Sequence, residues 1–321
     1  MRSYEMKKRK KCLLSVILTA AVLSGCSSGT VKLEDALKKT VSYEQETVTS
    51  PTSDTHGGEW VVIPLARSSQ KVDREYFKKY KENLEKKLEE QNGILSDYKY
   101  TEYSRAVLAV KAIGNDPADI GGYDIQKPLE DFETVTSQGL NGAIFALLAL
   151  NADRSDISGE LEQKYLNYIL QQEKADGGFS LDNNAEKGDA DITAMTLQSL
   201  EPYQKDKDVK KVTDRAVDFL ADAQDADGGY KAYGEYSSES VSQVIIALST
   251  LGIDCNSDSR FVKNKKGLYD ILMEYYQKDG SFSHTLDGKS DPMATDQAFC
   301  ALVSYERFKD GKNSLYNMTD E

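Results

Sequence analysis

The chain has 321 residues, of which 53 are acidic and 40 are basic, and its formal net charge at pH 7 is −13. The phosphates of nucleic acids repel so acidic a protein, which excludes nucleic-acid binding. The length allows either two ordinary domains or one large domain, and composition alone does not decide between them.

The N-terminus carries the features of a secretory signal. Five basic residues, Lys7, Lys8, Arg9, Lys10 and Lys11, precede a short apolar run at residues 13–23. A membrane-spanning helix needs about 20 apolar residues, and this run is much shorter. Residues 1–25 are therefore expected to be a signal peptide and not a membrane anchor.

The signal ends in Leu23-Ser24-Gly25-Cys26, which resembles the lipobox of bacterial lipoproteins. The resemblance implies cleavage before Cys26, lipidation of its thiol and attachment to the outer face of the bacterial cytoplasmic membrane. An ordinary signal peptide followed by a chance cysteine is the alternative. Residues 26–30 would form the lipidated cysteine and a short spacer. Without residues 1–25 the chain keeps 34 basic and 52 acidic residues, a net charge of −18.

Few cysteines remain for structural use. Cys12 leaves with the signal and Cys26 would be lipidated, so only Cys255 and Cys300 are left. Two cysteines are too few for a disulfide framework. Cys300 fits a small core residue in an apolar helical pattern, and a Cys255–Cys300 bridge is the alternative.

From residue 31 onward the pattern is helical, and two kinds of helix alternate. The first kind has one apolar stripe and a charged back, which is typical of an outer layer with one buried face. The expected outer helices are residues 31–46, 77–88, 122–130, 161–169, 209–223 and 268–275. The second kind is apolar most of the way round and rich in small residues, as in a buried inner layer. The expected inner helices are residues 59–66, 102–113, 137–150, 191–200, 239–251 and 295–305.

The alternation gives six outer-then-inner pairs at a spacing of roughly 35 to 55 residues, which is a repeat architecture. Six pairs are enough to close a ring. No strand pattern and no low-complexity linker interrupts them, so residues 31–312 are expected to form one all-α domain, followed by a tail at residues 313–321.

The joints between outer and inner helices share an Asp, a glycine turn and an aromatic residue. Asp176-Gly177-Gly178-Phe179 is the clearest example, and related sequences begin at Asp119, Asp227 and Asp279. Glycine permits the positive φ needed where a helix stops and the chain reverses. We interpret these joints as structural.

The motifs QQEKADGGF, QDADGGY and QKDGSF, with the inner openings DADITAMTLQSL, SESVSQVIIALSTLG and ATDQAFCALVSY, resemble the prenyltransferase and squalene-cyclase repeat. The resemblance reaches from about residue 31 to residue 308 and implies an (α/α)6 toroid of six outer and six inner helices. The chain is most similar to the secreted or cell-surface members of that superfamily. The superfamily also contains terpenoid cyclases and cobalamin carriers. Fold follows from the resemblance, but function does not.

Zinc-dependent prenyl transfer is not expected. Its metal site needs Asp, Cys and His side chains that converge on one ion. The chain has only His56 and His284, and the inner openings at residues 189–193 and 238–243 contain no cysteine. We therefore expect no metal.

The alternative enzyme is a class II terpenoid cyclase. Its DxDD motif would correspond to Asp189-Ala190-Asp191-Ile192, where the last Asp is replaced. The resemblance would make Asp191 the general acid and Asp189 the residue that tunes it. Helix N-termini favour an ionised carboxylate, however, and the replacement of the last Asp removes an acidic neighbour that would keep Asp191 protonated.

Parallel inner helices would bring their polar first turns together at one mouth of the ring. Amides, hydroxyls, carboxylates and aromatic rings would then form a hydrogen-bonding cavity. For each residue taken alone, helix capping is the simpler explanation. The candidate ligand-binding residues are Glu59, Trp60, Glu102, Tyr103, Gln138, Asn141, Thr193, Glu239, Gln243, Thr295 and Gln297, with Asp296 and Ser242 beside them.

The sequence thus predicts a lipid-anchored toroid that binds a small molecule, glycan or protein partner at this mouth without catalysis. Cobalamin is one candidate ligand, since the carriers of this superfamily share the toroid, but we expect this chain to lack the second domain with which they clamp it. The terpenoid cyclase is the catalytic alternative.

Overall fold

The computed structural model describes residues 30–53, 57–232 and 234–320. The description below concerns the compact unit Val31–Glu321. The predicted signal peptide and the predicted lipidation site Cys26 lie outside the described residues.

Helices of two kinds alternate along residues 31–320, as predicted. The outer helices are α1 (Leu33–Thr47), α3 (Arg74–Glu90), α5 (Phe132–Ser137), α7 (Glu160–Leu170), α9 (Lys207–Ala223) and α11 (Leu268–Leu272). The inner helices are α2 (Glu59–Arg67), α4 (Tyr100–Ala112), α6 (Leu140–Leu150), α8 (Ala190–Leu200), α10 (Ser238–Thr250) and α12 (Pro292–Lys309). Three short 3₁₀ helices are η1 (Lys127–Glu130), η2 (Glu201–Tyr203) and η3 (Met273–Tyr275).

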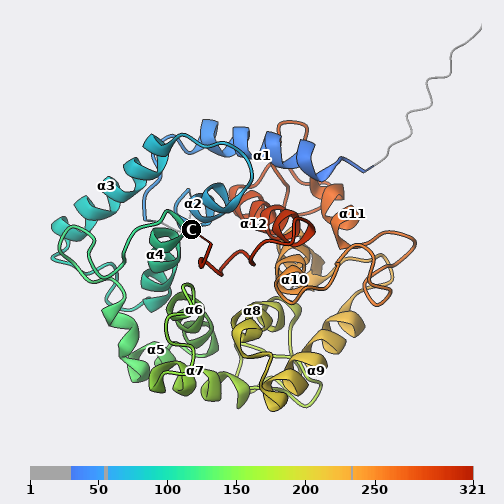
Figure 1. Ribbon diagram of the computed structural model, residues 1–321. Coiled ribbons are helices and arrows are strands. Elements are labelled where there is room, and N and C mark those ends of the chain that lie inside the picture. Colours follow the sequence, from blue (N-terminus) through green and yellow to red (C-terminus); the bar gives the residue numbers. More distant parts are fainter. Residues whose placement is uncertain (1–29, 54–56, 233, 321) are drawn as a thin grey trace, which may run out of the picture. The chain divides into compact units, whose positions relative to one another are not determined.

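The inner helices form a closed ring within the outer helices (Figure 1). Each inner helix contacts the next in the order α2, α4, α6, α8, α10, α12, and α12 returns to contact α2. Helix α6 therefore stands across the ring from α12, and α4 stands across from α10. The prediction of an all-α toroid with six outer and six inner helices is confirmed for the described residues.

Burial separates the two layers as the sequence patterns indicate. On outer helix α9 the buried residues form one stripe that includes Val209, Val212, Ala216 and Leu220. On inner helix α6 every residue except Asn141 is buried. An inner helix packs against its two ring neighbours and an outer helix, so a single polar position in it stands out as the one that faces the centre.

Three local details differ from the prediction. The third outer helix is Phe132–Ser137 and not residues 122–130, which form a bridged turn and η1. Gly139, at φ 78°, interrupts the predicted helix 137–150. Two short antiparallel strands, β1 (Lys231–Ala232) and β2 (Glu235–Tyr236), form a hairpin before α10 where no strand was expected.

The glycine-rich joints bring the chain into close contact with itself. A Cβ added to Gly188, just before α8, would lie 2.5 Å from the Cα of Gly178 in the preceding joint. Only glycine tolerates this approach of two backbones. The contact fixes where α8 begins, and thus where its first-turn side chains lie.

Cys255 and Cys300 are both free and buried, so the alternative of a disulfide bridge between them is wrong. Across the described ranges, no helix has the length and apolar character required to cross a membrane.

Candidate active site in the centre of the ring

A cavity of about 210 Å³ opens in the middle of the inner ring. Side chains from all six inner helices line it, together with one residue that follows α12. The lining residues are Trp60, Thr101, Arg105, Asn141, Phe145, Met195, Gln243, Ile246, Asp296, Gln297, Cys300 and Tyr316.

The register of the inner helices explains why these residues meet. Asn141 and Phe145 are four residues apart on α6, and Thr101 and Arg105 have the same spacing on α4. Residues four apart lie on the same face of a helix, one turn below the other. The cavity therefore has an upper layer from the first turns and a deeper layer from the second turns.

A chain of amides orders one side of the cavity. The Gln198 Nε2 donates to Gln243 Oε1 at 2.9 Å, and Gln243 Nε2 donates to Gln297 Oε1 at 3.0 Å. Gln243 thus uses both ends of its amide, whereas Gln198 and Gln297 each use one end. This pairing fixes the orientation of Gln243 and Gln297, both of which line the cavity.

The facing side of the cavity is aromatic and cationic. The rings of Trp60 on α2 and Phe145 on α6 lie 5.7 Å apart between centroids. Between them α4 supplies Arg105, whose Nε lies 3.6 Å from Glu59 Oε2. Glu59 is fully buried and accepts a hydrogen bond from the Tyr80 hydroxyl at 3.2 Å. Glu59, predicted to contact a ligand, is placed behind the cavity wall, where it holds Arg105.

Asp296 is the carboxyl group in the cavity wall. Burial raises its pKa to about 7, and the nearby Asp291 carboxylate acts in the same direction. Behind it, on outer helix α1, burial and the Asp296 carboxylate raise the pKa of Glu44 to about 9. The pKa of Tyr76 is also raised, first by burial and then by Glu44 and Asp296. Both shifts favour the protonated form of these two carboxyl groups.

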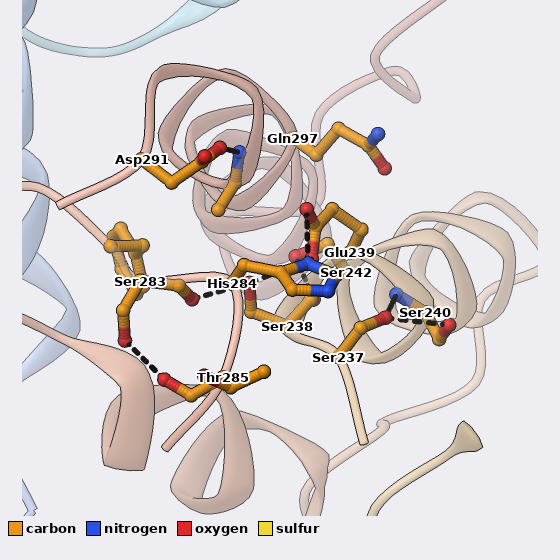
Figure 2. Close-up of polar contacts among 12 residues, drawn as sticks. Ser237, Ser238, Glu239, Ser240, Ser242, Ser283, His284, Thr285, Asp291 and Gln297 are labelled. Carbon is orange, nitrogen blue, oxygen red and sulfur yellow. Dashed lines mark hydrogen bonds and ion pairs between the residues drawn. The ribbon is translucent and has the colours of Figure 1, made fainter. Parts of the chain in front are cut away.

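Figure 2 shows a second polar group, in which His284 from the segment before α12 meets Glu239 in the first turn of α10. The His284 Nδ1 lies 2.9 Å from both carboxylate oxygens of Glu239. Glu239 is four residues before Gln243, so it stands one turn above the cavity wall. The bond to Glu239 raises the pKa of His284.

Asp191 and Asp189 differ in their roles. Asp189 caps α8, because its Oδ1 accepts from the Ile192 backbone N–H at 2.8 Å. Asp191 lies in the first turn of α8, where burial raises its pKa and a hydrogen bond with Ser240 opposes the shift. The Glu239 carboxylate also acts on Asp191, so the first turns of α8 and α10 form an acidic part of the rim.

Several predicted ligand-binding residues lie outside the cavity wall. The Thr193 and Thr295 hydroxyls accept hydrogen bonds from the backbone N–H groups of Phe179 and Phe282 in the preceding joints. The Gln138 side chain accepts from the Tyr100 backbone N–H. The Tyr103 hydroxyl accepts from the Leu95 backbone N–H, and Glu102 lies in a shallow depression with Gln91 and Tyr98. Trp60, Asn141, Gln243 and Gln297 line the cavity, and Glu239 stands at its rim.

The sequence did not predict the deeper layer of the cavity, nor the two residues that reach the site from outside the inner helices, Tyr316 and Glu44. Arg105, Phe145 and Met195 each follow an opening residue by four positions, so helical spacing alone could have found them. No comparable signal exists for Tyr316 or for Glu44, because both reach the site by tertiary packing. Among the described residues, no group of three or more His, Cys, Asp and Glu side chains is placed to hold a metal ion.

Comparison with known proteins places this ring in a family. Residues 136–200 and 192–318 match the model of the prenyltransferase alpha-alpha toroid domain, and the chain belongs to that family. None of the curated proteins matches the chain in sequence.

Three similar solved structures are enzymes that share the fold. A polysaccharide lyase matches with 16% identity and a TM-score of 0.59, over 87% of this chain and 97% of its own. The unsaturated glucuronyl hydrolase of Bacillus sp. GL1, responsible for the degradation of glycosaminoglycan, matches with 12% identity and a TM-score of 0.57, over 90% and 99%. A UGL variant with dGlcA-Glc-Rha-Glc matches with 11% identity and a TM-score of 0.58, over 90% and 99%.

These structures correct two functional predictions. The prediction of a toroid that binds a ligand without catalysis is wrong, because the similar solved toroids are a hydrolase and a lyase. The alternative of a terpenoid cyclase is wrong for the same reason. The sequence motifs identify the toroid repeat but not the chemistry, because one fold supports many unrelated functions.

Proposed function

We propose that this toroid is a glycan-processing enzyme that breaks a glycosidic bond in the central cavity, with Asp296 as the general acid. The observation that carries the proposal is the position of Asp296 in the cavity wall, with a pKa of about 7. A general acid must hold its proton at the working pH and release it to the leaving oxygen. An ordinary surface aspartate is ionised at neutral pH and cannot do so.

The other lining residues suit a sugar. The rings of Trp60 and Phe145 offer an apolar surface for the C–H face of a pyranose ring. The amides of Asn141, Gln243 and Gln297 can exchange hydrogen bonds with hydroxyl groups. Arg105 adds a cation that favours a negatively charged substituent, such as a carboxylate.

Most glycoside hydrolases use a second carboxylate besides the acid. Glu239 at the rim fits this role, since it is held by His284 and stands one turn above Gln243. We infer that Glu239 takes a proton from the attacking water while Asp296 protonates the leaving oxygen. The two groups come from adjacent inner helices, α10 and α12, so a sugar between them would meet both.

The proposal is tested by cleavage of dGlcA-Glc-Rha-Glc and of glycosaminoglycan fragments by the wild type and by Asp296→Asn. We expect cleavage by the wild type and a loss of about 10²- to 10⁴-fold in kcat/KM in the variant, because the proton donor is gone. Trp60 is the only tryptophan, so its fluorescence reports binding in both proteins. Unchanged turnover in Asp296→Asn, or binding of these sugars with no cleavage by the wild type, would refute the proposal.

The His284–Glu239 pair at the rim supports a second candidate function, that of a lyase. The His284 side chain is about half exposed, whereas that of Glu239 is 13% exposed. This pair can accept a proton from a carbon next to a carboxylate, which starts a β-elimination. Arg105 would then stabilise the negative charge on that carboxylate. Elimination leaves a new C=C bond in the product, and ultraviolet absorption of the products therefore separates a lyase from a hydrolase.

We further propose that the enzyme works outside the cytoplasm, held at a membrane surface by lipid on Cys26. The supporting feature is the order of basic residues, short apolar run and Leu23-Ser24-Gly25-Cys26. Such an enzyme would meet glycans at the cell surface.

A further inference from the structure

After α12 the chain turns back and runs across the ring. In Figure 1 this C-terminal segment, drawn in red, passes through the middle of the inner helices. Leu315, Tyr316 and Met318 in it are buried. A terminal segment is usually poorly ordered unless it is tied down. Here two buried arginines hold the segment in place, one at the end of α2 and one at the end of α12.

Arg67, whose side chain is fully buried, holds the segment at three points. Its Nη2 donates to the carbonyl oxygens of Ser314 at 3.1 Å and of Asn317 at 2.7 Å. Its Nη1 pairs with Asp320 Oδ1 at 2.7 Å. Arg307, with a side chain only 6% exposed, pairs with the other oxygen of the same carboxylate.

Two further hydrogen bonds attach the segment to opposite sides of the ring. Arg307 Nε donates to the carbonyl oxygen of Asn313 at 2.7 Å, beside α12. The Met318 backbone N–H donates to the carbonyl oxygen of Ala152, just past the end of α6, at 2.6 Å. Helices α12 and α6 stand across the ring from each other. The segment from Asn313 to Asp320 therefore spans the end of the ring opposite the rim.

Tyr316 is the residue that this span places in the cavity. It lines the cavity at the depth of Ile246 and Cys300, which belong to the third turns of α10 and α12. Below this depth lie the bonds of Arg67 and Arg307. The cavity is thus open at the helix N-termini, where Glu239 and His284 stand, and Tyr316 closes its deep end.

We propose that residues 313–320 form a fixed floor and that Tyr316 sets the depth of the site, so that only the terminal sugar unit of a glycan enters and the enzyme cuts at chain ends. This inference rests on the proposed function. A polymer cannot pass through a ring whose far end is closed. A volume of about 210 Å³ is also below the about 300–1,000 Å³ of pockets that enclose drug-sized ligands, which suits one sugar ring.

The test uses glycosaminoglycan oligosaccharides labelled at the reducing end and follows the products over time. The wild type should shorten the labelled chain from the far end, one unit at a time. Tyr316→Ala should deepen the cavity and release units of two sugars, while Tyr316→Phe, which keeps the ring, should still release one sugar unit at a time. Early appearance of labelled fragments of intermediate length with the wild type would overturn the inference and leave the proposed function standing.

A second measurement examines the floor without turnover. Acrylamide quenches tryptophan fluorescence on contact, and Trp60 lies in the cavity wall. We expect Tyr316→Ala to increase quenching of Trp60 by about twofold or more relative to Tyr316→Phe, because the deep end becomes open. Equal quenching in the two variants would show that Tyr316 does not close the cavity, even if no test glycan is cleaved.

Discussion

Asp296 and Glu44 show how burial changes the chemistry of a carboxyl group. Both side chains lie in the protein interior, on α12 and α1, and each is harder to ionise there than in water. Removing a charge from water is costly, so the neutral form is favoured. The same shift that makes Asp296 suitable as a general acid makes the folded protein sensitive to pH.

The free energy of unfolding should decrease as the pH rises from 5 to 9. Glu44 and Asp296 have ordinary values of 4.5 and 3.8, and in the folded protein their pKa values are about 9 and about 7. Their contribution is fully present below the unfolded values and is lost as the pH rises through the folded values. We therefore expect the free energy of unfolding to be highest at pH 5 and lowest at pH 9.

Urea unfolding at pH 5, 7 and 9 measures this loss. His284, whose pKa is also raised, changes stability in the same direction, so the comparison is between wild type and the double variant Glu44→Gln with Asp296→Asn. The variant should show a flatter pH dependence. The same slope in both proteins would exclude the two carboxyls as its source.

Glu59 and Glu102 test the difference between a supporting residue and a surface residue. Glu59→Ala leaves the mostly buried Arg105 without its ion pair and should lower the free energy of unfolding by about 3–5 kcal/mol. Glu102→Ala should change it by no more than about 0.5 kcal/mol, because Glu102 makes no comparable buried contact. Chemical denaturation of both variants gives the values, and equal effects would contradict the assignment.

At the scale of elements, the joints are built alike. The Asp189 backbone N–H donates to Phe179 O at 2.9 Å, and the Asp291 backbone N–H donates to Phe282 O at 2.8 Å. Both aspartates cap the inner helix that follows, α8 and α12 respectively. In each case a threonine four residues after the cap, Thr193 or Thr295, accepts from the backbone N–H of the joint's aromatic residue, Phe179 or Phe282. The repeated sequence thus produces the same set of hydrogen bonds between joint and inner helix in both repeats.

Thr193→Val should remove one of these hydrogen bonds and lower the free energy of unfolding. It removes the hydroxyl that accepts from the Phe179 N–H and leaves that buried donor unpaired, at a cost of about 1–3 kcal/mol. Thr196 on the same helix is the matched control, since its buried hydroxyl has no partner among the described residues. Thr196→Val should be neutral or slightly stabilising. Thermal unfolding compares the two, and a larger loss for Thr196→Val would reverse the interpretation.

At the scale of the whole molecule, closure of the ring joins the first and last repeats. The Thr40 hydroxyl on α1 donates to the carbonyl oxygen of Gly280 at 2.7 Å. Gly280 has φ 101°, and a Cβ there would lie 2.5 Å from the Lys39 carbonyl oxygen. Closure brings Glu44 on α1 behind Asp296 on α12, so the proposed acid depends on contact between the two ends of the fold.

Membrane attachment is the other property of the whole molecule that can be tested. If Cys26 is lipidated, the wild type should fractionate with membranes and Cys26→Ser should be released, because the acyl chains supply the binding free energy. Mass spectrometry of the N-terminal peptide checks the modification directly. Cys12→Ser is the control, since it alters a cysteine within the predicted signal. Membrane association of both variants would argue against the lipid anchor.

The sequence by itself determined the layers and the joints. Apolar stripes on outer helices and uniform burial on inner helices follow from helical periodicity, and the joints follow from the backbone freedom of glycine. These are local properties, which explains why the alternation and five cavity residues, Trp60, Asn141, Gln243, Asp296 and Gln297, could be predicted. The closed ring was expected from the number of helix pairs and from the resemblance to a toroid family.

Only the tertiary structure decided which polar residues face the cavity and how deep it is. Glu59 and Thr193 have the polar side chains expected at the mouth, but neither lines the cavity. Glu59 pairs with Arg105, and the Thr193 hydroxyl accepts from the Phe179 backbone N–H in the preceding joint. Tyr316 reaches the cavity only because Arg67 and Arg307, far apart in sequence, hold its segment together. The proton of Asp296 likewise depends on desolvation, which no local pattern encodes, because burial is a property of the assembled fold.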